Sequence, residues 1–211
     1  MSSALMMEDD VDWDIRIRSQ MQDLAKGVRH LSNVRANQHQ LSPYGDDWDV
    51  IWPGHCGEVL PEGDNHQYII LNDETVAPKA HQPWLKALKD LPEQTRIIHK
   101  TGAPICTFAY AVSTRGAQKI LAGLGLKGSG LNFDNALAYF CRDGMLDIKC
   151  FTVQPMLFFH HRAAGSMNKD SDTVSTESGV REKGFTENIV WSARLNLEKL
   201  LTGATDYVLQ W

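Results

Sequence analysis

The stretch Ala4-Leu5-Met6-Met7-Glu8-Asp9-Asp10 sets a short apolar run, typical of a strand, directly before three consecutive acidic residues. Downstream of it, apolar residues recur at steps of three and four, the spacing of one face of an amphipathic helix. These residues are Trp13, Ile17, Met21, Leu24, Val28 and Leu31. Because strands and helices that alternate along a chain favour α/β architecture, the sequence predicts an α/β fold with acidic side chains at the end of its first strand.

The rest of the chain continues this alternation. Short segments rich in apolar, β-branched and aromatic residues predict strands at 48–52, 67–71, 105–112, 146–153 and 156–159. Helices are expected after an N-cap at Ser113, over 132–140, and over about 186–201, where Ile189, Ala193 and Leu197 share one face. We therefore expect a main domain over 1–161, a polar loop or lid over 162–185, and a C-terminal helix and tail over 186–211.

Composition and charge narrow the class of protein. The chain has 211 residues, of which 43% are hydrophobic and 22% charged, so a disordered or fibrous chain is excluded. With 21 Lys and Arg against 26 Asp and Glu, the net charge is −5, which makes a poor general binder of nucleic-acid phosphates. No stretch approaches the roughly 18 apolar residues of a membrane-spanning helix. Five of the 26 acids fall between Glu8 and Asp14, so the acidic excess has a focus.

The four cysteines, Cys56, Cys106, Cys141 and Cys150, are widely spread and form no C-x-x-C pair. This spacing matches neither a zinc ribbon nor a small disulfide-rich scaffold. Two disulfides remain open, and buried free thiols are the simpler interpretation.

The acidic run Glu8-Asp9-Asp10 is the sharpest candidate site. Side chains alternate along a strand, so Glu8 and Asp10 are expected on one side and Asp9 on the other. Two converging carboxylates suit a hard divalent cation such as Mg²⁺ or Mn²⁺, which would neutralise a diphosphate. The alternative is that Asp10, Asp12 and Asp14 cap the next helix and match its dipole. Both roles are compatible, because one acid can cap while the others chelate.

Asp134 and a pair of histidines are further candidates. Asp134 opens the helical run Phe133-Asp134-Asn135-Ala136-Leu137, where it is either an N-terminal cap or a general base toward an attacking hydroxyl. His160 and His161 follow an apolar strand, and one of them is a candidate metal or phosphate contact. Because neighbouring side chains on a strand point opposite ways, at most one faces any given site.

Weaker candidates for substrate contact are His55 and Glu58, expected in an exposed loop after a strand, and Tyr110, which is otherwise a core aromatic residue. The segment Gly123–Gly128 matches G-x-G-x-x-G. Its glycines follow a helix instead of a strand, where they are the expected C-cap, so we reject a dinucleotide site.

Several of these segments, in order along the chain, resemble glycosyltransferase family 25, which includes lipopolysaccharide and procollagen galactosyltransferases and many fungal members. Ala4-Leu5-Met6-Met7-Glu8-Asp9-Asp10-Val11 is similar to the family's L-E-D-D-V metal motif, and Trp48-Asp49-Val50-Ile51-Trp52-Pro53-Gly54 to its W-D-V strand. Thr107–Ser113 with Gly116-Ala117 and Ile120-Leu121 resembles its A-Y…S…G-A…L-L strand and helix, and Phe133–Leu137 its D-x-x-L element. The resemblance covers residues 4 to 160.

The resemblance implies a GT-A-like fold that transfers a hexose, usually galactose, from a UDP-sugar to a hydroxyl of a glycan or protein acceptor by inverting displacement. It implies a divalent cation, Mn²⁺ or Mg²⁺, held by Glu8 and Asp10 with Asp9 nearby, and Asp134 as the base. His160 or His161 would contact the metal or phosphate, and His55 and Tyr110 would lie on the substrate side. Complete members are expected in the ER or Golgi.

One departure from the family concerns the start of the chain. Family members have a sizeable region before the acidic motif, which here begins at residue 8, so the sequence is expected to be an N-terminally truncated member with an incomplete GT-A-like fold. A non-catalytic remnant that binds glycan or protein is therefore the alternative function. A nuclease or phosphohydrolase fits the carboxylates but not the other ordered motifs.

Overall fold

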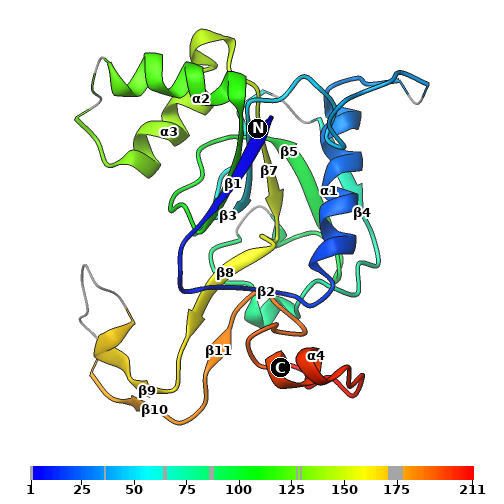
Figure 1. Cartoon of the computed structure of the whole chain (residues 1–211), viewed down its shortest axis with the longest axis vertical. Coiled ribbons are helices and arrows are strands. Elements are labelled where there is room, and N and C mark those ends of the chain that lie inside the picture. Colours follow the sequence, from blue (N-terminus) through cyan, green and yellow to red (C-terminus); the bar gives the residue numbers. More distant parts are fainter. Residues whose placement is uncertain are drawn as a thin grey trace.

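The computed structural model describes residues 2–35, 37–63, 66–85, 88–126, 128, 130–170 and 178–211 and shows a mixed α/β protein. Its centre is a six-stranded sheet with strand order β1-β6-β3-β7-β5-β4 (Figure 1). Of the neighbouring pairs, β3 and β7 are parallel and the other four are antiparallel. The strands are β1 (Ser3–Met7), β3 (Val50–Gly54), β4 (Gln67–Ile70), β5 (Arg96–Lys100), β6 (Ala109–Ser113) and β7 (Cys150–Gln154). The coarse prediction of an α/β fold is confirmed.

Helix α1 (Ile17–Leu31) covers one face of this sheet, beside β4 and β5 (Figure 1). Its buried residues Leu24, Val28 and Leu31 fall on the face predicted from the sequence, and they pack in one cluster with Ile98 of β5. Contact with β5 is close at Gly27, where a Cβ atom would lie 2.9 Å from the Ile98 side chain.

The opposite face of the sheet is covered by α2 (Thr114–Ile120), the π-helical turn η3 (Leu121–Gly125) and α3 (Phe133–Arg142). Val50 and Trp52 of β3 point to this side, and Ile51 between them points to α1, as alternation along a strand requires. The Ser113 side chain caps α2 by accepting a hydrogen bond from the N–H of Gly116 at 3.0 Å, as predicted.

The Asp49 carboxylate fastens α2 to the sheet. It is fully buried and accepts hydrogen bonds from Arg115 Nε at 2.7 Å, Lys119 Nζ at 2.6 Å and the N–H of Lys149 at 2.8 Å. Burial alone would raise the pKa of Asp49, but these donors outweigh it and hold the pKa below its ordinary value. The aspartate of the Trp48-Asp49-Val50 motif therefore has a structural role.

A smaller layer lies below the main sheet in Figure 1. It contains the three-stranded sheet β11-β8-β2, the two-stranded sheet β10-β9 and the terminal helix α4. The bounds are β2 (Val11–Trp13), β8 (Phe158–Arg162), β9 (Gly165–Ser166), β10 (Val180–Arg181), β11 (Phe185–Thr186) and α4 (Leu197–Thr202). Single 3₁₀ turns are η1 (Lys79–His81), η4 (Met145–Asp147) and η5 (Met167–Lys169).

Asp12 holds the C-terminal segment against β2. Its carboxylate is fully buried and accepts hydrogen bonds from the hydroxyls of Thr186 and Ser192 and from the N–H of Arg194. Asp14 binds Arg16 through two side-chain nitrogens and accepts a hydrogen bond from the N–H of Trp191 at 2.9 Å. The interpretation as a cap of the next helix is wrong for Asp12, whose carboxylate is bonded to the end of the chain, but it is borne out in part for Asp14, whose Oδ1 also accepts the N–H of Arg16 at 2.9 Å, directly before α1.

The structure adds detail at three further places that the sequence did not indicate. Residues 186–201 do not form one helix: β11 ends at Thr186, an irregular segment follows, and only Leu197–Thr202 is helical. The polar stretch 162–185 contains β9, η5 and β10, and its residues 171–177 lie outside the described part of the chain. Strand β5, in the interior of the sheet, was not predicted.

The cysteines form two disulfides, Cys56–Cys106 and Cys141–Cys150, so the simpler interpretation of buried free thiols is wrong. The first pair is 50 residues apart in sequence but joins the loop that follows β3 to the loop that precedes β6. These strands are neighbours in the sheet, which brings the two loops together. Spacing along the chain alone could not show this proximity.

Among the described helices, none has both the length and the apolar character needed to cross a membrane.

Candidate functional site

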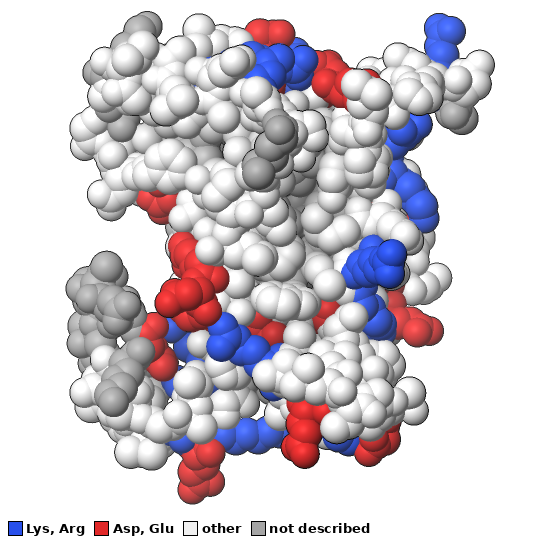
Figure 2. Space-filling model, in the orientation of Figure 1, with Lys and Arg blue, Asp and Glu red and all other residues white. Residues whose placement is uncertain are grey.

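The acidic run lies where β1 and β3 end and β6 begins. The register pairs Met7 of β1 with Ala109 of β6, so Glu8 emerges beside the segment that leads into β6. Glu8 is tied there by its own N–H, which donates to the carbonyl of Phe108 at 3.0 Å. Figure 2 shows acidic side chains gathered at the bend between β1 and β2, with Lys and Arg side chains directly below them. The carboxyl ends of strands are a recurrent place for ligand sites in α/β proteins.

A turn brings the two outer acids together. Residues 9 and 10 form a turn between β1 and β2, so the predicted convergence of Glu8 and Asp10 arises from a turn and not from alternation along a strand. The side chains of Glu8, Asp10 and His160 each offer one ligand atom within 4.8 Å of the others. His160 Nε2 lies 2.6 Å from Glu8 Oε2 and 3.5 Å from Asp10 Oδ1. Asp9 is exposed beside this cluster and lines the same cavity.

Neighbouring residues hold the members of this cluster in place. The imidazole ring of His160 packs on the buried ring of Phe108, with 3.7 Å between their centroids. The Thr107 hydroxyl donates to Glu8 Oε1 at 3.1 Å, which leaves Oε2 to face His160. Two carboxylates and one imidazole are therefore oriented toward a common point, and this donor set suits a divalent cation that accepts both oxygen and nitrogen.

A cavity of about 470 Å³ opens over the cluster, and its lining includes a positively charged side chain as well as the acids. Arg162 lines this cavity, and its guanidinium donates to the carbonyl of Asp170 at 3.1 Å. The described residues of its lining are Glu8, Asp9, Asp10, Cys56, Trp84, Phe108, Phe159, His160, Arg162 and Asp170. Sequence reasoning did not identify Arg162 or Thr107. The alternation that places His160 in the cavity also places Arg162 there, two residues further along β8.

The structure does not bring Asp134 into this cavity, whose described lining omits it. Asp134 lies in the first turn of α3, and its Oδ2 accepts a hydrogen bond from the N–H of Cys106 at 3.1 Å. The loop that carries Cys106 continues into Thr107, which binds Glu8. Asp134 and the acidic cluster are therefore connected through this loop, and the role of Asp134 as a base stays a prediction.

His161 and Tyr110 face other surroundings. His161 lies on the side of β8 opposite His160, where its Nδ1 is 3.0 Å from the Thr186 hydroxyl and 4.0 Å from Asp12 Oδ2. Burial lowers the pKa of His161. The ring of Tyr110 packs between Trp52 and Phe133 on the α3 side of the sheet, and burial raises the pKa of its phenol. Of the two histidines, only His160 joins the acidic cluster.

The expectation that His55 and Glu58 lie in an exposed loop is wrong. His55 is completely buried, with Nε2–H donating to the carbonyl of Val153 and Nδ1 accepting from the N–H of Gly57, both at 3.1 Å. Burial lowers the pKa of His55 to about 4, so its ring is neutral. The Glu58 side chain is also buried, and burial raises its pKa to about 8. The loop folds inward because these side chains hydrogen-bond backbone groups of neighbouring segments.

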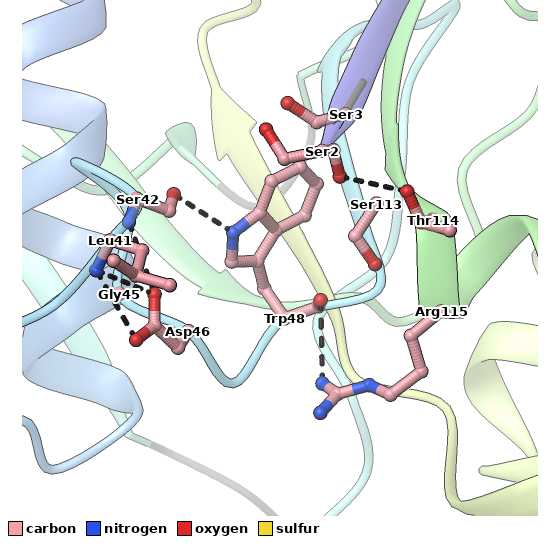
Figure 3. A pocket seen from close by; sticks show the side chains of 10 residues that line it. All are labelled: Ser2, Ser3, Leu41, Ser42, Gly45, Asp46, Trp48, Ser113, Thr114 and Arg115. Carbon is pink, nitrogen blue, oxygen red and sulfur yellow. Dashed lines mark hydrogen bonds between the residues drawn. The ribbon is translucent and has the colours of Figure 1, made fainter.

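A second cavity, of about 380 Å³, lies at the opposite ends of the same strands (Figure 3). Its lining consists of Ser2, Ser3, Leu41, Ser42, Gly45, Asp46, Trp48, Ser113, Thr114 and Arg115. The Trp48 indole donates to the Ser42 hydroxyl at 3.2 Å, and the Asp46 carboxylate accepts from the N–H groups of Leu41 and Ser42. Arg115 is engaged with Asp49 and Asp47. These charged groups serve the fold, so we place the candidate site at the acidic cluster.

Comparison of the chain with family models, curated proteins and solved structures gave no match. The site is therefore interpreted from its own geometry and from the sequence resemblance.

Proposed function

We propose that this chain is a metal-dependent glycosyltransferase with a GT-A-like fold, which transfers a hexose from a UDP-sugar to a hydroxyl acceptor by inverting displacement. The observation that carries the proposal is the cluster of Glu8, Asp10 and His160 within 4.8 Å, beneath a cavity that also contains Arg162. It supports the metal motif that the family resemblance implies at these residues. Galactose is the sugar that the resemblance favours.

The donor set fits a cation of the Mn²⁺ type. Carboxylate oxygens suit Mg²⁺ and Mn²⁺ alike, and the imidazole nitrogen of His160 favours Mn²⁺ of the two. When bound, such a cation would supply positive charge that stabilises a leaving diphosphate. Glu8 and Asp10 would hold it, and Phe108 and Thr107 would keep its ligands oriented. Arg162, on the same side of β8 as His160, would bind phosphate oxygens through its guanidinium.

In the proposed reaction, the acceptor oxygen forms a bond to the anomeric carbon while the bond from that carbon to the diphosphate oxygen breaks. A base takes the proton of the acceptor hydroxyl. We retain Asp134 as the predicted base from the family resemblance. In this structure Asp134 Oδ2 accepts the N–H of Cys106 and Oδ1 accepts the side-chain amide of Asn135.

The test is to add Mn²⁺ and UDP and to measure the thermal unfolding midpoint of the chain. A ligand that binds the native state raises this midpoint by mass action. We expect a rise that Asp10→Asn and Glu8→Gln abolish. Asp9→Asn is the matched control: it removes the same charge from the same turn but lies outside the cluster. No rise with the native chain, or an equal loss with Asp9→Asn, would refute the metal site. Transfer is then measured as UDP release from UDP-galactose, which Asp134→Asn should abolish without weakening UDP binding.

The second candidate function is a non-catalytic module that binds glycan or protein. The position of Asp134 outside the cavity favours it, because the predicted base is absent from the described lining. Binding of Mn²⁺ and UDP without any transfer, to water or to sugar acceptors, would support this function over the enzyme.

A further inference from the structure

A third cavity, of about 510 Å³, adjoins the acidic one. Its lining consists of Cys56, Gly57, Glu58, Val59, Trp84, Ala103 and Ile105. Cys56 and Trp84 also line the cavity over Glu8 and His160, so the two cavities share a wall. A molecule seated in the third cavity would therefore lie next to any ligand held by the acidic cluster. Its volume falls within the range of ordinary small-ligand sites.

Trp84 is the largest side chain in this wall, and it is unusually exposed for its size. It is 56 % exposed, and its ring packs on Phe159 with 5.9 Å between their centroids. Large apolar side chains at the rim of the same cavity, Val59 and Ile105, are also exposed. An indole that packs on Phe159 and is otherwise exposed to solvent offers a flat apolar surface to a ligand.

The backbone holds Trp84 in this position at a cost. Its φ is +63°, a left-handed conformation that bulky residues seldom adopt. Gly57, with φ of +136°, lies against it: a Cβ atom at residue 57 would be 3.1 Å from both Cβ and O of Trp84. Gly57 follows Cys56, whose disulfide to Cys106 fixes the loop. Three features therefore hold the exposed indole in place: the left-handed backbone of Trp84, the close contact with Gly57 and the disulfide of Cys56. An indole that was exposed without a role would need none of them.

The described lining of the third cavity is close to neutral, and this limits the chemical class of ligand that it can bind. Among the described residues of the lining, the only titratable side chain is that of Glu58, which is buried with one carboxylate oxygen bonded to the N–H of Gly102. Burial raises its pKa, so that carboxyl is largely protonated near neutral pH. A charged ligand such as a phosphate would find no counter-charge among the described residues that line this cavity. A pyranose ring suits it, because the C–H face of the sugar stacks on an indole while the hydroxyls stay at the rim.

We propose that Trp84 is the stacking platform of a sugar-binding subsite, which holds the acceptor hexose beside the cluster of Glu8, Asp10 and His160. The identification of its occupant as an acceptor rests on the proposed glycosyl transfer. A sugar stacked on Trp84 lies against the wall that this cavity shares with the cavity over Glu8 and His160.

The test is binding of methyl β-D-galactopyranoside to the whole chain in the presence of EDTA, which removes any divalent cation from Glu8, Asp10 and His160. Saturation-transfer NMR reports which sugar protons contact the protein, and the ¹⁵N-labelled indole signals report which tryptophan responds. We expect millimolar binding, with saturation strongest on the ring C–H protons and a shift of the Trp84 indole signal. Trp84→Ala should weaken binding about tenfold, whereas Trp84→Phe, which keeps an aromatic face, should stay within about threefold of the native chain.

Tyr139→Ala is the matched control, because Tyr139 is an exposed aromatic residue on α3, outside this cavity. It should bind the sugar as the native chain does. No binding by the native chain, or a shift confined to other tryptophan signals, would overturn the subsite even if the alanine variant failed to fold. The outcome is separate from the Mn²⁺ and UDP titration: sugar binding without UDP binding would remove the transferase proposal and leave a glycan-binding site, and the reverse would remove this subsite alone.

Discussion

The buried carboxyl of Glu58 predicts an unusual loss of stability as the pH rises. Its side chain is fully buried, one oxygen accepts the N–H of Gly102, and the other has no hydrogen-bond partner among the described residues. His99 Nε2 lies 3.8 Å from that second oxygen. The His99 ring is neutral, since burial lowers its pKa to about 4. Glu58 therefore lacks a cation to stabilise its ionised form, and burial raises its pKa from 4.5 to about 8.

The sign and the size of the effect follow from this pKa. A carboxyl whose pKa is higher in the folded protein stabilises the fold fully below its unfolded pKa of 4.5, and that stabilisation is lost as the pH rises through about 8. One pKa unit corresponds to about 1.4 kcal/mol, so the free energy of unfolding should fall by about 3 kcal/mol between pH 6 and pH 9 from this group. The buried His55 and His99 act in the other direction: with pKa values lowered to about 4, they destabilise the fold only as the pH falls below 6.5.

The perturbation that isolates this effect is Glu58→Gln, which imitates the protonated carboxyl and can still accept the N–H of Gly102. Urea unfolding followed by tryptophan fluorescence at pH 6, 7, 8 and 9 gives the free energy of unfolding of both proteins. Because glutamine does not ionise in either state, the difference in free energy of unfolding between the variant and the native chain should grow in favour of the variant by about 3 kcal/mol between pH 6 and pH 9. Glu74→Gln, at an exposed carboxyl, is the control and should show no such divergence. A difference between native and Glu58→Gln that stays constant with pH would refute the reasoning.

Three further predictions concern stability and are measured by the same urea unfolding. Asp12→Ala should lower the free energy of unfolding by about 3 kcal/mol, because it leaves several buried donors without an acceptor; a loss below about 1 kcal/mol would contradict this. Gly123→Ala should cost about 2 kcal/mol, since the new Cβ would meet the buried ring of Phe140 at 2.2 Å. Gly125→Ala, where the nearest atom is 3.8 Å away, should cost nothing, and equal effects at the two glycines would be the contrary result. Replacing Cys56 and Cys106 together by serine should cost about 4 kcal/mol for a link across 50 residues, and unchanged unfolding midpoints would show that the bond does not constrain the chain.

Local patterns in the sequence predicted the elements whose packing is itself periodic. Helix α1 was predicted because Leu24, Val28 and Leu31 repeat at helical spacing, and the same residues are buried in the structure. The cap at Ser113 was predicted because one side chain satisfies a local backbone group. The segment from Thr186 to Asn196 was misjudged as helix, because its apolar spacing is helical but its polar groups bind Asp12 and Asp14, far away in sequence.

The candidate site was predictable to a similar extent. Glu8 and Asp10 were identified from the sequence, and alternation along a strand correctly limited the histidines to one facing residue. That the facing residue is His160, 152 positions after Glu8, depends on the pairing of β2 with β8, which no local pattern encodes. Trp84, Cys56 and Thr107 carry no local signal either, since each reaches the site through a loop whose path is set by the sheet. The inward turn of His55 and Glu58 was missed because loop residues after a strand are ordinarily exposed.

The acidic residues from Glu8 to Asp14 serve two parts of the molecule, the cavity and the C-terminal segment, and this affects how the site forms. Glu8 and Asp10 face the cavity, whereas Asp12 and Asp14 fix the segment around residues 186–194, and these contacts join positions more than 170 residues apart. Closing such distant contacts is slow compared with forming local helices, so the ligand cluster should be among the last parts of the molecule to assemble. Glu8, Asp10 and His160 would therefore bind a cation only in chains that have finished folding, so that cation binding would measure the fraction of fully folded chains.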